Sequence, residues 1–123
     1  MRAMQVKSEE TTMDSASRVL HQGRLFTGEL VDTDDEGRTL GITGYQEGVE
    51  HGPQAEWYPD GAKRLEGQCD RGSAVGEWRQ WHANGRLAEY SLFNKYGELI
   101  HLKRWDEAGT LLEDKKSAIT RGL

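Results

Sequence analysis

The sequence is poor in cysteine and in long hydrophobic runs, and both shortages narrow the classes of protein to consider. Its single cysteine, Cys69, cannot form a disulfide within the chain and belongs to no metal-binding spacing. No apolar run approaches the roughly 18 residues that a membrane-spanning helix needs. Residues 1–18 contain no hydrophobic stretch of the kind found in a secretory signal peptide. These shortages predict a cytoplasmic protein.

The chain is also poor in apolar residues and in positive charge. At 123 residues it has the length of one domain, and its 35% hydrophobic content is too low for a thick, double-layered core.

Residues 1–60 carry five Lys or Arg against twelve Asp or Glu, and residues 61–123 carry eleven against nine. Nucleic acid and anionic lipid both attract clustered positive charge, so neither is expected as a direct ligand. The acidic first half suits a basic protein partner, or is a solvated surface that keeps the chain soluble.

A 24-residue repeat organises what is present. Each period contains two β-prone runs of about six residues, separated by glycine-containing turns. Strands joined by tight turns pair with their sequence neighbours, and stacked hairpins share a core that no single hairpin has. The sequence therefore predicts an all-β fold, an elongated antiparallel meander of hairpin repeats. The recurring columns are Gly37, Gly61, Gly85 and Gly109; Gly28, Gly52 and Gly76; Gly48 and Gly72; and Trp57, Trp81 and Trp105.

The repeat domain is expected at residues 23–114, between a polar N-terminal lead-in at 1–22 and a C-terminal tail at 115–123. Residues 1–14 are polar and are expected to be mobile. The segment from Asp14 to Gly23 is compatible with one short helix, capped by Asp14 and ended by Gly23, and also with an extended lead-in. The sequence leaves these two alternatives open.

Several motifs occur in a fixed order in the middle of the chain, and together they resemble the MORN-repeat variant family over residues 28–112. The resemblance implies the meander fold. Bacterial members of this family are commonly described as antitoxin-like proteins. The resemblance therefore implies a non-catalytic interaction module, an antitoxin- or immunity-type binder that blocks a partner sterically. The motifs are WYPDG at 57–61, LEGQC at 65–69, the glycine pair Gly72 and Gly76, and EWRQWHANG at 77–85.

The sequence departs from the family pattern in two places. Cys69 stands where an aromatic residue is usual, and in the third unit Lys95, Tyr96, Gly97 and Ile100 replace the glycine pair. The last unit is therefore expected to act as a cap.

Tryptophan supplies the candidate contact residues. Trp57, Trp81 and Trp105 are expected to form an aromatic ladder across neighbouring hairpins, either as core residues packed on the glycine columns or as a concave surface that grips a partner. Trp78 lies three residues before Trp81, so in a regular strand their side chains point to opposite faces. Trp78, with Tyr58, is therefore the expected anchor. Steering charge is expected from Asp32, Asp34, Asp35, Glu36, Glu47 and Glu50.

The alternative function is a small enzyme or small-molecule binder that uses the groove of a curved sheet. His82, His101 and Cys69, with a carboxylate such as Glu56, would then perform acid–base or nucleophilic chemistry. Each has a simpler interpretation: His82 as a turn or surface residue, Cys69 as a small buried residue, and Glu56 as one of 21 acids.

No metal or cofactor is expected from the sequence. The histidines show no metal-ligand spacing, and no glycine-rich loop opens a helix that would bind phosphate. A third interpretation of the chain is a scaffold that self-associates through unpaired sheet edges.

Overall fold

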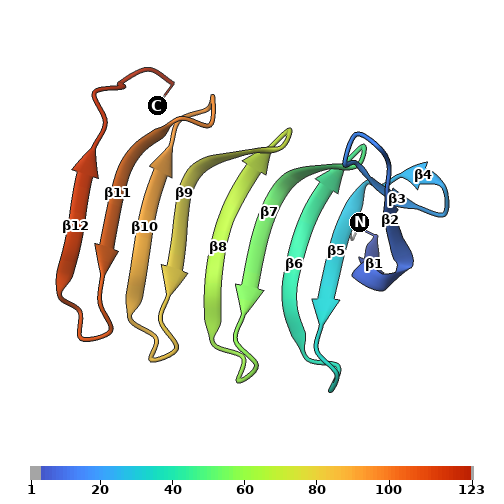
Figure 1. The fold of residues 1–123 in the computed structure, drawn as a ribbon, viewed down its shortest axis with the longest axis horizontal. Coiled ribbons are helices and arrows are strands. Elements are labelled where there is room, and N and C mark those ends of the chain that lie inside the picture. The colour runs from blue at the N-terminus through green and yellow to red at the C-terminus, as the bar shows by residue number, and fades with distance from the viewer. Residues whose placement is uncertain (1–3, 123) are drawn as a thin grey trace.

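The computed structural model describes residues 4–122 as an all-β chain built on a nine-stranded sheet (Figure 1). Strands β5 to β12 follow one another as an antiparallel meander, and β1 adds to β5 in parallel. The predicted fold class is confirmed. In spatial order the strands are β1 (Gln5–Lys7), β5 (Gly28–Thr33), β6 (Thr39–Gln46), β7 (Val49–Trp57), β8 (Lys63–Asp70), β9 (Ser73–Trp81), β10 (Leu87–Phe93), β11 (Leu99–Trp105) and β12 (Leu111–Lys116).

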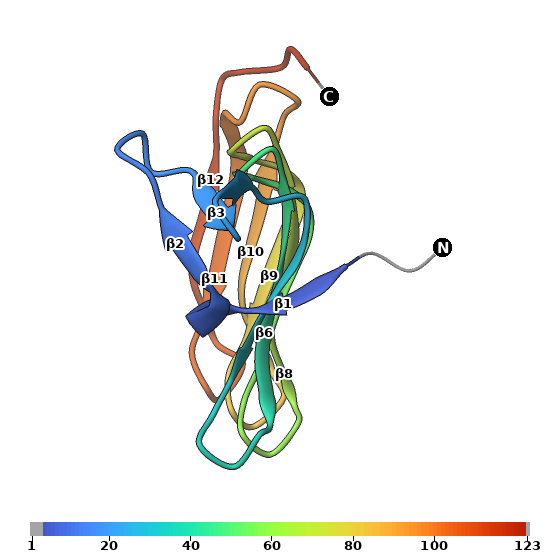
Figure 2. The same ribbon diagram turned by 90° about the vertical axis from the view of Figure 1, so that its right-hand side faces the viewer.

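The N-terminal residues form a cap rather than the expected tail. A 3₁₀ turn (Ser8–Glu10) is followed by a three-stranded sheet of β2 (Thr11–Met13), β3 (Val19–His21) and β4 (Arg24–Leu25). Figure 2 shows this small sheet on one side of the large one, which is otherwise a single layer. The buried side chains of Val6, Val19 and Phe26 pack there against Leu30 and Tyr45. Residues 4–22 of the expected lead-in thus form short strands and a 3₁₀ turn, and residues 1–3 lie outside the described part.

The segment that begins at Asp14 is extended rather than helical. The Asp14 carboxylate accepts hydrogen bonds from the backbone N–H groups of Ala16 and Arg18, both at 2.9 Å. Asp and Asn side chains stabilise turns in this way. Asp14 therefore closes the β2–β3 turn, and the sequence pattern that resembles a helix N-cap serves a hairpin.

Side chains of the large sheet alternate between two faces. On the face that carries the N-terminal cap, Leu30, Thr43, Gln54 and Gly67 lie opposite one another on β5 to β8. We call this the cap face. The other, here called the open face, carries a continuous row of opposed residues from β5 to β12: Val31, Ile42, Ala55, Glu66, Arg79, Tyr90, Lys103 and Asp114.

The turns at the two ends of the sheet explain the glycine columns. At the lower end of Figure 1, the glycines at the 24-residue spacing have φ between +80° and +91°, a range that a residue with a Cβ rarely adopts. At the upper end, Glu47–Gly48 and Arg71–Gly72 both have positive φ at two successive residues, as a type I′ hairpin turn requires. The lower glycines are Gly37, Gly61, Gly85 and Gly109.

A β-bulge also recurs every 24 residues, beside each lower turn. In each case one residue is skipped in the pairing between neighbouring strands. Bulges bend a strand and increase its twist, so a regular series of them gives the sheet a regular curvature. The skipped residues are Leu40, Arg64, Ala88 and Leu112.

The C-terminal residues fold back on the sheet instead of forming a free tail. The N–H of Lys95 donates to the backbone oxygen of Gly122 at 2.9 Å. The Arg121 guanidinium contacts both carboxylate oxygens of Glu98 at 2.9 Å. Of the segment expected as a tail, residues 115 and 116 belong to β12, and residues 117–122 reach the β10–β11 turn. Leu123 lies outside the described part.

Candidate protein-binding surface

Trp78, the expected anchor, lies on the cap face across the backbone of Gly67. A Cβ placed on Gly67 would come within 2.1 Å of the Trp78 ring, so only glycine leaves room for the indole. The Trp78 Nε1–H donates to the backbone oxygen of Gln68 at 3.1 Å. The side chain is half-buried. Trp78 is therefore seated on the sheet with its polar atom already bonded, which leaves ring surface for contact.

The residues one period away from Trp78 are Gln54 and Leu102, which occupy the same column of the cap face. Gln54 is buried, with only 6% of its surface exposed, and its amide donates to the backbone oxygen of Gly52 at 3.2 Å. Leu102 lies opposite Ser91, just as Gln54 lies opposite Thr43. The cap face therefore carries one aromatic side chain in this column, between a polar and an aliphatic neighbour.

The three periodic tryptophans point to the open face and are half-buried. Their rings do not stack on each other; the ring–ring pairs of the described residues involve only Phe, Tyr and His. Instead, Lys63 lies over Trp57 at 5.9 Å and Lys103 over Trp105 at 5.8 Å from the ring centroids. Trp81 lies opposite Leu87. The aromatic ladder is thus a periodic series of separate residues. Trp57 and Trp81 each face a side chain of the adjacent strand, and Trp105 faces Lys103 of its own strand.

Tyr58 and His82 occupy the same column at the lower turns and make the same contact. The Tyr58 hydroxyl donates to the backbone oxygen of Trp81 at 2.6 Å, and His82 Nε2 lies 2.9 Å from the backbone oxygen of Trp105. A carbonyl only accepts, so Nε2 of His82 carries the proton. Each side chain therefore joins its own hairpin to the next.

The six acids expected to steer a partner form two groups, one at each end of strand β6. Four of them lie in or beside the β5–β6 turn, and Glu47 and Glu50 lie at the β6–β7 turn. Between the two groups runs β6, whose eight residues span about 26 Å at the usual rise of a strand. The lower group consists of Asp32, Asp34, Asp35 and Glu36.

Asp34 serves its own turn. Its carboxylate accepts the backbone N–H groups of Glu36 and Arg38 and contacts the Arg38 guanidinium at 2.7 Å. These hydrogen bonds, that of the Arg38 backbone first, hold the pKa of Asp34 below its ordinary 3.8. Glu36 lies 3.4 Å from Arg38, whereas Asp32 and Asp35 form no ion pair among the described residues. Asp32 and Asp35 are the acids of this group that are left for a partner.

The four residues proposed for catalysis are each held in a separate contact. Cys69 Sγ lies 3.8 Å from Glu50, and burial, followed by the Glu50 carboxylate, raises the pKa of Cys69 to about 11. His101 Nε2 lies 2.6 Å from Asp114 on the open face. Glu56 pairs with Arg64 at 3.3 Å. No contact joins two of the four candidates, and a thiol with so high a pKa is a poor nucleophile.

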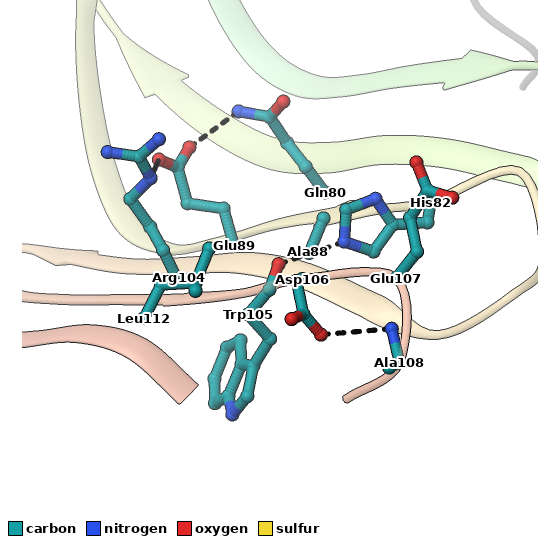
Figure 3. Close-up of a pocket in the computed structure, with 10 residues that line it drawn as sticks. All are labelled: Gln80, His82, Ala88, Glu89, Arg104, Trp105, Asp106, Glu107, Ala108 and Leu112. Atoms are coloured by element: carbon teal, nitrogen blue, oxygen red, sulfur yellow. Dashed lines mark hydrogen bonds and ion pairs between the residues drawn. The ribbon is translucent and has the colours of Figure 1, made fainter. Parts of the chain in front are cut away.

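His82 lines a surface cavity of about 590 Å³ at the lower end of β9 to β12 (Figure 3). Most of its charged groups are already engaged: Glu89 contacts Gln80 at 2.7 Å and Arg104 at 3.9 Å, and Asp106 accepts the N–H of Ala108. Glu107 and Leu112 are exposed members of the lining. Neither was predicted from the sequence, although Asp35 and Leu40, three repeats earlier in the same columns, lie in and beside the acidic β5–β6 turn.

Searches against protein-family models, curated proteins and solved structures found no match for this chain. The resemblance to MORN-repeat variants therefore stays a prediction from the sequence motifs. Within residues 4–122, no group of three or more His, Cys, Asp or Glu side chains could hold a metal ion. In the same part of the chain, no helix has the length and apolarity needed to cross a membrane.

Proposed function

We propose that this chain is a non-catalytic module that binds a basic protein and blocks it sterically, in the manner of an antitoxin or immunity protein. The observation that carries the proposal is the single-layered sheet. Beyond the N-terminal cap, no second layer formed by residues 4–122 covers either face of strands β7 to β12, and the side chains of these strands are mostly half-buried or exposed. Such a sheet offers a wide, rigid area for contact with another protein.

Charge supports a basic partner. The acidic residues of the first half outnumber its basic residues by seven, and Asp32 and Asp35 are not neutralised by an ion pair within the described residues. Complementary charge raises the association rate more than it raises the affinity. In this proposal the β5–β6 turn guides the partner, and Trp78 provides contact area on the cap face.

The candidate catalytic groups favour binding over chemistry. A general base needs to lie within hydrogen-bonding distance of a group that it activates. Here His82 bonds a backbone oxygen, His101 bonds Asp114, and Cys69 bonds Glu50. The proposal keeps the cytoplasmic location expected from the sequence.

The proposal is tested by capture from a native lysate with charge-reversal variants in or beside the β5–β6 and β11–β12 turns. The bait is the wild-type chain, the Asp32→Lys, Asp35→Lys variant, or the Glu107→Lys variant, which changes the position equivalent to Asp35 at the other end of the sheet. We expect one basic protein in stoichiometric amount with the wild type and Glu107→Lys, lost with Asp32→Lys, Asp35→Lys. The proposal would be contradicted if no protein is captured, or if the wild type and the Asp32→Lys, Asp35→Lys variant capture the same protein equally well.

The alternative, a small-molecule binder or small enzyme, rests on the cavity beside His82. Native mass spectrometry of the purified chain decides between the two. A retained small molecule that is lost in Ala88→Trp, which fills the cavity, would favour the alternative.

A further inference from the structure

Strand β12 is an open edge of the sheet. Within the described residues it pairs only with β11. The N–H of Ser117 donates to the backbone oxygen of Ile100 at 2.8 Å. In an antiparallel ladder the backbone groups of alternate residues point toward the neighbouring strand, so Ser117 and every second residue before it face β11. By that alternation, the backbone N–H and C=O groups of Asp114 and Lys116 point away from β11. They are available to another strand.

The two edge strands of the sheet, β1 and β12, differ in how well they are protected from pairing with a further strand. At the N-terminal end the edge strand β1 has three residues, and the small sheet with its buried Phe26 lies beside it. At the C-terminal end β12 has six residues, and Leu111 and Leu112 are 49% and 63% exposed. Short or covered edge strands resist pairing, whereas a long open edge invites it. The C-terminal edge is therefore the one equipped to accept a strand.

We propose that β12 pairs antiparallel with β12 of a second copy of this chain, about a two-fold axis through Asp114, so that two nine-stranded sheets become one continuous sheet. This symmetry puts the cap faces of both copies on the same side of the joined sheet. It also places even-numbered residues of one β12 opposite even-numbered residues of the other, and odd-numbered opposite odd-numbered. Asp114 then lies opposite its own copy, and Glu113 lies opposite Lys115 of the second copy. The proposal does not depend on the proposed function.

Charge complementarity supports this pairing. Charged side chains usually keep an edge strand single, but the order Glu113, Asp114, Lys115, Lys116 is self-complementary under a two-fold axis. Two Glu113–Lys115 pairs form on the cap face, and opposite charges directly across a sheet are favourable. The two Asp114 carboxylates at the axis each have His101 at 2.6 Å and Lys103 at 3.9 Å in their own chain. A register two residues further on would form two Asp114–Lys116 pairs and place the two Lys115 side chains opposite each other, each with only Glu113 of its own chain beside it at 3.4 Å. The Glu113→Lys variant distinguishes the two registers, because Glu113 has no charged residue opposite it in the second one.

Sedimentation of the full chain from about 10 μM to about 1 mM tests the proposal, with three variants and one control. Glu113→Lys and Lys115→Glu each place like charges opposite one another at two symmetric positions, so each is expected to weaken dimerisation by about tenfold or more. The double variant Glu113→Lys, Lys115→Glu exchanges the two charges and is expected to recover most of the loss. Glu9→Lys makes the same charge change as Glu113→Lys in the 3₁₀ turn at the N-terminal edge of the molecule and is expected to leave the dimer unchanged. Circular dichroism checks that each variant is folded.

The expected result is a concentration-dependent dimer whose Kd follows the pattern above. A chain that stays monomeric at every concentration overturns the proposal that a second copy pairs with β12. The open edge would then be available to a strand of another protein. A dimer that is indifferent to Glu113→Lys, or that the exchanged double variant does not recover, overturns the proposed pairing.

Discussion

The hydroxyl of Tyr58 and the backbone oxygen of Trp81 form a hydrogen bond of 2.6 Å that joins one hairpin to the next. His82 repeats the contact 24 residues later with the oxygen of Trp105. One period earlier the column holds Asp34, which bonds within its own turn instead. The lower turns are thus connected in series along the second half of the sheet. In a single-layered repeat protein such contacts between neighbours replace part of a shared core.

Tyr58→Phe is expected to lower the free energy of unfolding by about 1 kcal/mol. The substitution keeps the ring and removes only the donor to the Trp81 oxygen, and a net protein hydrogen bond is worth roughly that much. Urea denaturation followed by circular dichroism measures the change. Tyr96→Phe is the matched control, because the Tyr96 side chain is 58% exposed and its hydroxyl bonds to no described residue. An equal loss in both variants would contradict a joining role for Tyr58.

Gly67→Ala is expected to destabilise the fold by about 1–3 kcal/mol, as overpacking usually does. The new methyl group would lie 2.1 Å from the ring of Trp78, so the indole must move. The change is measured as the free energy of unfolding, and tryptophan fluorescence reports the displaced ring.

The double variant Gly67→Ala, Trp78→Leu separates this clash from a general intolerance of alanine at this position of the strand. It reproduces the neighbouring pair Ser91 and Leu102, a small side chain opposite a leucine. We expect its destabilisation to fall short of the sum of the two single variants by about 1 kcal/mol or more, because residues in contact are not additive. Additive losses would show that Gly67 is required for the backbone alone.

The fold could be predicted because its signals are local and periodic. A lower turn needs positive φ at Gly61 and again at Gly85, and the spacing between them sets the length of two strands and one upper turn. The glycine columns therefore predict the strand order, and no knowledge of contacts between distant residues is needed.

The N-terminal cap could not be predicted in the same way. Residues 5–25 lie outside the repeat, and their strands are short, at two or three residues. Val6 and Val19 look isolated in the sequence, and only tertiary packing against Phe26 shows that they form the core. Asp14 was ambiguous because the same carboxylate-to-amide bonds cap a helix or close a turn.

The candidate site was predicted less well than the fold, because it depends on which side chains are already bonded. The sequence grouped Asp32 with Glu47 by charge, although a whole strand separates them. It could not show that Asp34 is engaged by Arg38 or that the Trp78 N–H is bonded to Gln68.

Cys69 is expected to react slowly with iodoacetamide near neutral pH, with a rate that rises until about pH 11. Burial, and then the Glu50 carboxylate, raise its pKa from 9.0 to about 11, so at pH 8 the thiolate is about a hundredfold scarcer than at the ordinary value. Glu50→Gln removes the charge and is expected to shift the pH–rate profile downward. The urea-unfolded chain, in which the thiol is solvated, is the reference. A folded-state profile that matches the unfolded one would contradict the burial of Cys69.

Asp114 is expected to make stability depend on acid pH through its contact with His101. The hydrogen bond from His101, at 2.6 Å, holds the pKa of Asp114 below its ordinary value of 3.8, and Lys103 contributes in the same direction. A depressed pKa means that the folded state favours the ionised carboxyl. The stabilisation is therefore fully present above pH 3.8 and is lost as the pH falls through the folded-state pKa.

Asp114→Asn removes the titrating group, so the difference in unfolding free energy between the wild type and this variant isolates its contribution. Asp14, Asp34 and Glu98 also have lowered pKa values, but they are present in both chains, so their effects cancel in the difference. We expect the wild type to be the more stable chain at pH 5–6 and the gap to narrow steadily below pH 4. Asp35→Asn, the same change at an exposed turn residue, controls for the general loss of one carboxylate. A gap between wild type and Asp114→Asn that is independent of pH from 2 to 6 would show that the contact with His101 does not bind the ionised carboxyl selectively.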